Sequence, residues 1–164
     1  MLKDENTRLR VLAEHDWLTG LYNRNRYIER LEAYKQVQDQ QIGAIYIDLN
    51  GLKKVNDEQG HRAGDELIVR AAGTIAGIFA EDAYRVGGDE FVVILLDVSR
   101  EDFARKTEQL RRQMQENSVD ASIGGVWQAS TENLENLLRR ADENMYREKK
   151  RYYSQADAAR KPES

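Results

Sequence analysis

The stretch "RVGGDEFVVIL" at residues 85–95 places two glycines and two acids beside apolar residues that read as a buried strand. The apolar segments on either side of Gly87 and Gly88 predict the two strands of a hairpin. A two-residue turn needs positive φ, which glycine adopts without strain. The turn explains the glycines but not the adjacent acids Asp89 and Glu90, whose carboxylates repel each other and lose hydration if they are buried.

A third acid offers a reason for the first two. The run "IGAIYIDL" at residues 42–49 is apolar and β-branched until Asp48, which predicts a buried strand ending in a carboxylate. If this strand lies beside the hairpin, Asp48 and Asp89 meet at one sheet edge. Magnesium takes carboxylate and phosphate oxygens, and two ions about 3.5–4 Å apart can hold both reacting oxygens of a phosphoryl displacement. The sequence therefore predicts a Mg²⁺ site, with Mn²⁺ as an alternative ion, beside glycines that let a nucleotide approach.

The rest of the chain supplies helices and one more strand. Asn23 is a good N-cap, and Ser99 forms a capping box with Asp102. Four helices are expected: one that begins at residue 23, one over 65–79 with a further helix possible before it, one from 99 to about 115, and one that begins at 131. The expected strands are 42–49, 82–86, 90–96 and 118–127. This order predicts an α+β ferredoxin-like fold, with helices returning to one side of a mainly antiparallel sheet.

Composition limits the possible functions. The chain has 164 residues, enough for one domain, and lacks cysteine, which excludes disulfides and thiolate metal sites and suits the cytoplasm. Its 25 basic and 29 acidic residues give a net charge of −4, so no overall attraction to nucleic acid is expected. Its apolar runs are far too short to span a membrane, and we expect no membrane contact from this segment.

The two ends differ from the middle. Residues 1–15 predict a helix with leucines at heptad-like spacing, which fits either a signalling helix or a helix that packs on its own domain. Residues 16–153 form the expected domain. The polar segment 154–164 holds the only proline and is predicted to be disordered.

Polar residues after Asp48 suit a guanine nucleotide. In "DLNGLKKVNDEQGHRAGDEL", Lys53 can offset phosphate charge, while Asn56 and Asp65 offer an amide and a carboxylate to a base edge. A carboxylate accepts together from the ring N–H and the exocyclic amine of guanine, a donor pair that adenine lacks.

Six ordered motifs carry a family resemblance. They are "DWLTGLYNR" (16–24), "DLNGLKKVND" (48–57), "GHRAGD" (60–65), "RVGGDEF" (85–91), "ASIGG" (121–125) and "ADENMYREKK" (141–150). The chain resembles a GGDEF domain, the diguanylate cyclase fold of bacterial second-messenger signalling, which has a nucleotidyl cyclase palm-like sheet. Such domains pair face to face and condense two GTP molecules into cyclic di-GMP with release of pyrophosphate.

The resemblance implies roles for individual residues. Asp48, Asp89 and the Leu49 carbonyl would hold the metals. Glu90 would assist as a further ligand or help to deprotonate the 3′-hydroxyl. The substrate-binding set would be Leu52 lining the base pocket, Lys53 and Lys149 at the triphosphate, Asn56 and Asp65 reading guanine, and His61 supporting the same loop.

The chain also departs from the family pattern. The Arg-x-x-Asp product-inhibition site of many members is replaced by Ile78 and Glu81, so we expect no such site here. Asn50 stands where the family commonly has a second aspartate, and Leu52 replaces a frequent phenylalanine. Tyr153 stands where some members have a phosphate-binding arginine.

Three functional interpretations stay open. The first is an active cyclase working as a homodimer of half-sites. The second is a catalytically silent module that binds GTP or cyclic di-GMP or another protein. The third, a cyclase with relaxed base choice, is disfavoured by Asp65. A sensor or regulatory domain is expected to be missing from the N-terminal side of this chain.

Overall fold

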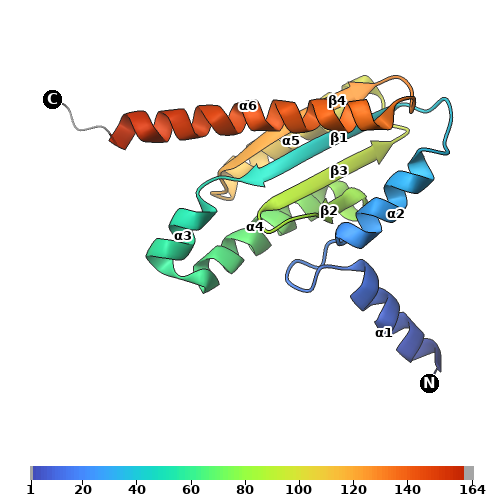
Figure 1. The fold of residues 1–164 in the computed structure, drawn as a ribbon, viewed down its shortest axis with the longest axis horizontal. Coiled ribbons are helices and arrows are strands. Elements are labelled where there is room, and N and C mark those ends of the chain that lie inside the picture. The colour runs from blue at the N-terminus through green and yellow to red at the C-terminus, as the bar shows by residue number, and fades with distance from the viewer. Residues whose placement is uncertain (1, 161–164) are drawn as a thin grey trace.

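The computed structural model describes residues 2–160, so residue 1 of the predicted N-terminal helix and residues 161–164 of the predicted tail lie outside the described residues. The helices are α1 (Leu2–Glu14), α2 (Arg24–Tyr34), α3 (Leu52–Gln59), α4 (His61–Phe79), α5 (Arg100–Glu116) and α6 (Leu134–Arg160), with a short 3₁₀ helix at Ala80–Asp82. The strands are β1 (Ile42–Leu49), β2 (Ala83–Arg85), β3 (Glu90–Leu96) and β4 (Ala121–Gln128) (Figure 1).

The four strands form one sheet in the order β2-β3-β1-β4, and every neighbouring pair is antiparallel. This order confirms the predicted α+β ferredoxin-like fold. The predicted N-caps are also confirmed, because Asn23 accepts from the Arg26 N–H and Ser99 accepts from the Asp102 N–H. Local side-chain chemistry therefore starts α2 and α5.

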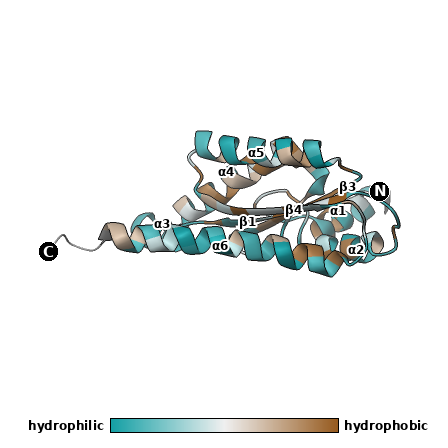
Figure 2. Cartoon of the chain, turned by 90° about the horizontal axis from the view of Figure 1, so that it is seen from above, coloured by the Kyte–Doolittle hydropathy of each residue, from teal (hydrophilic) through white to brown (hydrophobic). Residues whose placement is uncertain are grey.

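Helices cover both faces of the sheet, so the expectation that they return to one side is wrong (Figure 2). Strand side chains alternate between faces. Ile45 and Ile47 of β1 pack into a core with α4 and α5, whereas Ile42 and Ala44 pack with α6 on the opposite face. The alternation carries Asp48 to the same face as Ala44, which is the face that α6 covers.

A glycine lets α6 lie close to the sheet. A Cβ at Gly124 of β4 would overlap the α6 backbone at Ala141 and Met145. Only glycine permits this approach without moving the helix. The contact fixes the height of α6 over the sheet, and α6 then runs on past the end of β1 (Figure 1).

Two local predictions are corrected. Strands β2 and β3 are joined by residues 86–89, and neither Gly87 nor Gly88 has positive φ, so the connection is not a two-residue turn. The turn is longer than two residues, and it is closed by hydrogen bonds from the Val86 and Gly87 N–H groups to the Glu90 carbonyl. The segment predicted to be disordered is helical as far as Arg160, because it continues α6.

Helix α1 carries apolar side chains that do not pack on the domain. Leu9 and Leu12 are 61% and 73% exposed. Trp17, in the loop that follows, is 85% exposed. Figure 1 shows α1 projecting away from the sheet, which fits the first of the two interpretations of this helix.

Candidate functional site

The site is built where β1 and β3 meet beneath α6. Asp48 and Glu90 are directly paired in the antiparallel register of β1 and β3. The Asp48 side chain is 10% exposed, and its Oδ1 lies 2.9 Å from the Lys149 ammonium of α6. The same ammonium donates to the Leu49 carbonyl at 3.1 Å. One cation on α6 thus contacts two oxygens at the end of β1.

The electrostatics of Asp48 reflect this crowded position. Burial raises the pKa of Asp48 to about 6; the Lys149 ammonium opposes the rise, and the nearby Asp89 carboxylate adds to it. Two carboxylates held close together disfavour full ionisation of both unless a cation lies between them. The two carboxylates at the end of β1 and just before β3 therefore favour the binding of a cation.

The loop at residues 86–89 is fixed from two sides. Its Asp89 carbonyl accepts from the Leu49 N–H at 3.0 Å, which ties the loop to the end of β1. Arg85 donates to the Gly88 carbonyl at 2.9 Å and to both Asp16 oxygens, at 3.0 and 3.2 Å. Burial alone would raise the pKa of Asp16, but hydrogen bonds from Thr19 and Arg85 outweigh it and lower that pKa. Asp89 is thus held beside Asp48 by backbone and by an ion pair.

Helices α3 and α4 present the predicted base-reading residues. Gly64 of α4 packs against Asn56 of α3 so closely that a Cβ would overlap the Asn56 Oδ1. That oxygen is buried and has no hydrogen-bond partner in the described part of the chain. A buried acceptor without a donor is costly, so a donor that reached Asn56 would stabilise it.

The other predicted substrate-binding residues on α3 and α4 differ in how far they are buried. Leu52 is partly buried and packs against the core. Lys53 is exposed and lines a cavity of about 310 Å³ with Tyr152 and Tyr153 of α6. His61 and Asp65 are exposed on α4. The structure thus brings Asp48, Leu49, Asp89 and Lys149 into contact, and it sets the α3 and α4 residues beside them rather than among them.

Sequence reasoning missed a polar network beneath the site. Asn50 donates to the Asp120 Oδ1 at 2.9 Å and accepts from the buried Ser122 hydroxyl at 2.9 Å. Its backbone N–H also donates to the Asp120 carbonyl. The sequence marks Asn50 only as a departure from the family pattern. The signal for Asp16 and Arg85 was present too, because both stand in the quoted motifs.

The donor set at the edge fits a divalent cation. An ammonium already lies against the Asp48 Oδ1 and the Leu49 carbonyl, which shows that a positive charge is stabilised at this place. Among residues 2–160, no group of three or more His, Cys, Asp or Glu side chains could hold a metal by itself. Magnesium commonly uses one or two carboxylates and completes its shell with waters and substrate phosphates. The residues present match that incomplete type of site.

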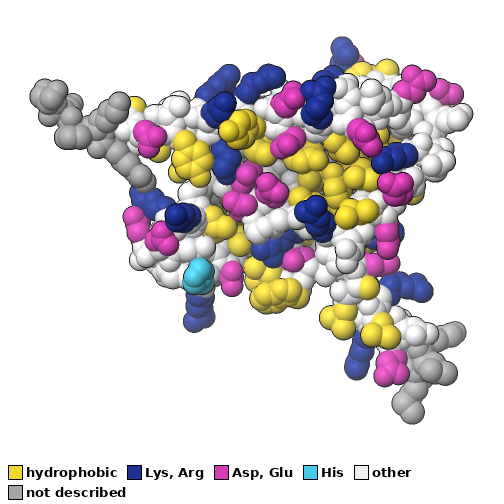
Figure 3. Space-filling view, in the orientation of Figure 1, with side chains coloured by type: hydrophobic (Ala, Val, Ile, Leu, Met, Phe, Trp, Pro, Cys, Tyr) yellow, Lys and Arg dark blue, Asp and Glu magenta, His cyan; other side chains and the backbone are white. Residues whose placement is uncertain are grey.

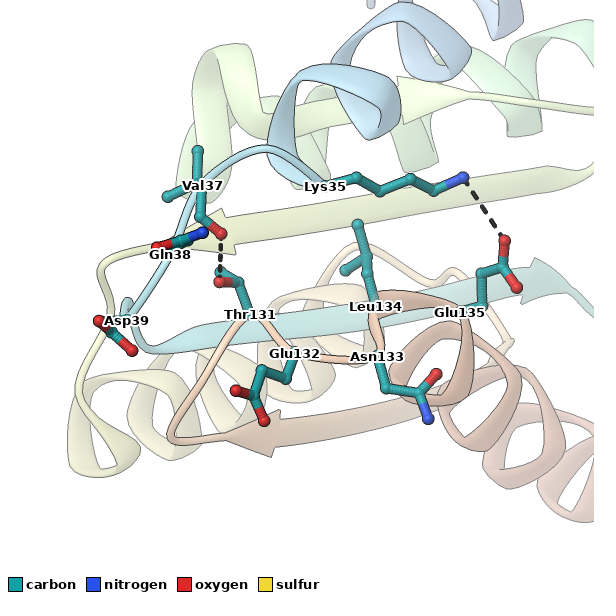
Figure 4. Close-up of a pocket in the computed structure, with 9 residues that line it drawn as sticks. All are labelled: Lys35, Val37, Gln38, Asp39, Thr131, Glu132, Asn133, Leu134 and Glu135. Atoms are coloured by element: carbon teal, nitrogen blue, oxygen red, sulfur yellow. Dashed lines mark hydrogen bonds and ion pairs between the residues drawn. The ribbon is translucent and has the colours of Figure 1, made fainter.

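A second pocket lies at the other end of the sheet. It is lined by the segment before β1 and the start of α6, where Thr131 donates to the Val37 carbonyl and Lys35 pairs with Glu135 (Figure 4). None of the predicted site residues lines it. Basic and acidic side chains are interspersed on the face shown in Figure 3, with no field of a single sign.

The strand order is that of a nucleotidyl cyclase palm-like sheet, and comparison with known proteins identifies the family. The family described as "Diguanylate cyclase, GGDEF domain" matches residues 13–155, and the chain belongs to it. The expected resemblance and fold are both confirmed.

Individual relatives agree. The chain is 34% identical over 158 residues to an uncharacterized signaling protein of Caulobacter vibrioides, covering 87% of this chain and 20% of that protein. It is 35% identical over 158 residues to the bifunctional diguanylate cyclase/cyclic di-GMP phosphodiesterase MucR of Pseudomonas aeruginosa, covering 88% and 23%. The coiled coil and GGDEF domain of DgcB from Caulobacter crescentus, solved with c-di-GMP, superimposes with a TM-score of 0.82 at 25% identity over 91% of this chain and 87% of that one.

These relatives are much longer than the part they share. The chain spans about a fifth to a quarter of the length of the two curated relatives. No helix within residues 2–160 is both long and apolar enough to cross a membrane.

Proposed function

We propose that this domain is an active diguanylate cyclase that condenses two GTP molecules into cyclic di-GMP with release of pyrophosphate. The observation that carries the proposal is the meeting of Asp48, Asp89 and a lysine ammonium where β1 ends beside β3. The Asn56 acceptor, which has no hydrogen-bond partner among residues 2–160, adds to it. Both acids that the family motif implies as metal ligands, Asp48 and Asp89, are present in this chain. Family membership supplies the reaction class.

The residues divide the work by chemistry. Asp48, Asp89 and the Leu49 carbonyl would hold Mg²⁺, or Mn²⁺, and Glu90 would assist there. The bound ion would neutralise phosphate charge and lower the pKa of the attacking 3′-hydroxyl. Lys53 and Lys149 would orient the triphosphate, and positioning with charge neutralisation is most of what phosphoryl transfer requires.

Base choice would rest on α3 and α4. The Asn56 Oδ1 would accept from the guanine amine, and Asp65 would accept from the ring N–H and amine edge. Leu52 would line the base pocket, and His61 would support the loop between the helices.

One domain presents one nucleotide, so the reaction requires a second copy face to face with the first. The exposed leucines of α1 would bring two copies together, under the control of a domain N-terminal to this chain. We place this signalling role in the bacterial cytoplasm, where GTP is available.

No product-inhibition site is proposed. Ile78, which replaces the arginine of that motif, packs against the core, while Glu81 is exposed. An apolar side chain engaged with the core offers no donor to a cyclic dinucleotide. Feedback through this surface is therefore not expected.

The test is product formation. Concentrated protein is incubated with GTP and Mg²⁺, and cyclic di-GMP and pyrophosphate are followed beside an Asp89→Ala control. Product from the wild type alone supports the cyclase. GTP binding without product at high protein concentration favours the alternative, a silent GTP- or cyclic di-GMP-binding module that has kept the fold.

A further inference from the structure

The Lys149 ammonium lies at the place that the proposed function assigns to a divalent metal ion. Its ammonium lies 2.9 Å from the Asp48 Oδ1 and 3.1 Å from the Leu49 carbonyl. Its side chain is 17% exposed. The Asp48 carboxylate and the Leu49 carbonyl are the groups assigned above to a divalent ion, so the lysine and the ion compete for the same partners.

We propose that Lys149 acts as an internal stand-in cation: it holds the divalent-metal position closed in the nucleotide-free protein and gives it up only when metal and nucleoside triphosphate arrive together. The inference rests on the proposed function for the identity of the nucleotide. It assigns the lysine a second role, as a gate on the metal position, besides its contact with the triphosphate.

The two cations cannot share the position. A magnesium ion needs its oxygen ligands at about 2.0–2.1 Å in near-octahedral geometry, and an ammonium 2.9 Å from the Asp48 Oδ1 and 3.1 Å from the Leu49 carbonyl blocks that approach. A divalent ion and an ammonium beside the same oxygens would also repel each other strongly in this largely buried place. Metal binding alone must therefore break the ion pair of Lys149 with Asp48 without offering the ammonium another anionic partner.

A triphosphate removes that cost. The freed ammonium sits on a flexible four-carbon chain and can turn to phosphate oxygens brought in with the metal. Metal and nucleotide then bind with positive coupling, and the coupling is reciprocal by linkage. The protein would avoid holding a divalent ion, or a nucleotide without its ion, in an unproductive state.

An aromatic ring already faces the Lys149 ammonium in its position beside Asp48. The Tyr153 ring, one helical turn further along α6, has its centroid 5.7 Å from the Lys149 ammonium. An aromatic face at this distance attracts a cation. Tyr153 borders the cavity that Lys53 also lines, so a lysine leaving Asp48 toward this ring moves to the side of the predicted triphosphate lysine.

The test measures binding rather than turnover. Mn²⁺ affinity is measured without nucleotide for wild type, Lys149→Met and Lys150→Met. The Lys150 control is exposed and lies over the Tyr146 ring, away from Asp48. We expect Lys149→Met to bind Mn²⁺ about tenfold or more tightly than wild type, because one competing charge is gone. Lys150→Met should match wild type, and Lys149→Met should bind a non-hydrolysable GTP analogue more weakly.

Two further variants locate the effect. The double variant Asp48→Asn, Lys149→Met should lose the gain in Mn²⁺ affinity, which places the ion at Asp48. Thermal unfolding of each variant checks folding, and Mn²⁺ should stabilise Lys149→Met more than wild type. Unchanged or weaker Mn²⁺ binding by Lys149→Met would overturn the inference, as would a gain that survives in the double variant.

The result of this binding test can be distinguished from the result of the test of the proposed function. A gain in Mn²⁺ affinity together with no cyclic di-GMP from the wild type would support the gate and reject the cyclase. Cyclic di-GMP formation with no gain in Mn²⁺ affinity would do the reverse.

Discussion

The Asp16 carboxylate and the Arg85 guanidinium form a two-bond ion pair, with both side chains at least four-fifths buried at 16% and 14% exposure. Asp16 follows His15, which comes directly after α1 and forms an isolated β-bridge with Tyr22. Arg85 is the last residue of β2. Because Arg85 also donates to the Gly88 carbonyl, the pair connects the N-terminal segment to the loop that carries Asp89. The segment that follows α1 is thereby linked to the loop beside the site.

Replacing Arg85 with Gln should reduce stability and activity together. The variant loses charged hydrogen bonds to Asp16 and Gly88, and we expect about 2 kcal/mol of lost unfolding free energy. The measurement is chemical denaturation with cyclase activity on the same samples. Arg105→Gln is the matched control, because its pair with Asp102 is exposed at 69% and 56% and should contribute less than about 1 kcal/mol. Equal losses in the two variants would contradict this role for Arg85.

Much of the fold follows from local sequence. The caps at Asn23 and Ser99 and the strand ending in Asp48 could be predicted because each depends on neighbouring residues alone. The position of α6 could not, because it depends on the close approach at Gly124, which pairs residues far apart in the chain. The turn at residues 86–89 was mispredicted because glycine permits positive φ but does not require it.

The site divides in the same way. The meeting of Asp48 and Asp89 could be predicted from where two strands end. The partnership of Lys149 with Asp48 spans 101 positions by number and depends on how α6 crosses the sheet, so resemblance pointed to the residue but not to its partner. The Asn50 and Asp120 contact was hidden because neither residue lies in a periodic pattern.

Stability of the metal-free protein should carry a component that titrates near pH 6. The pKa of Asp48 is raised to about 6 in the folded chain, above that of an unfolded aspartate. A raised pKa means that the folded state holds the proton more tightly, so this contribution is present at low pH and is lost as pH rises through about 6. Unfolding free energy measured between pH 3.5 and 7.5 should fall in wild type mainly between the unfolded value of 3.8 and about 6, and Asp48→Asn should lack this fall.

Metal binding gives the same carboxylate an independent readout. Mn²⁺ must displace the proton from Asp48, so Mn²⁺ affinity should fall as pH drops below about 6. A pH-independent Mn²⁺ affinity between pH 5 and 7.5 would show that Asp48 is not a ligand.

Changing Asn50 to the aspartate that the family commonly has should destabilise this chain. The Asn50 amide donates to the Asp120 carboxylate at 2.9 Å, and an aspartate would place two carboxylates at that distance. We expect a loss of about 1–2 kcal/mol, from one partly buried hydrogen bond replaced by repulsion. Thermal and chemical unfolding would measure it. The double variant Asn50→Asp, Asp120→Asn reverses the pair and should recover most of the loss, whereas no recovery would mean that Asp120 is not the cause.

Adding one methyl group at Gly64 should impair nucleotide binding without unfolding the domain. The Cβ of Gly64→Ala would overlap the Asn56 Oδ1 and push that side chain away from the position proposed to read guanine. We expect weaker binding of a GTP analogue, by about tenfold for one lost base contact, measured by calorimetry. Gly73→Ala in the same helix is the control, since a Cβ there meets nothing within 4 Å. It should leave binding unchanged and raise stability by about 0.5–1 kcal/mol, because alanine is the better helix former. If Gly64→Ala bound the analogue as tightly as Gly73→Ala, Asn56 would not read the base.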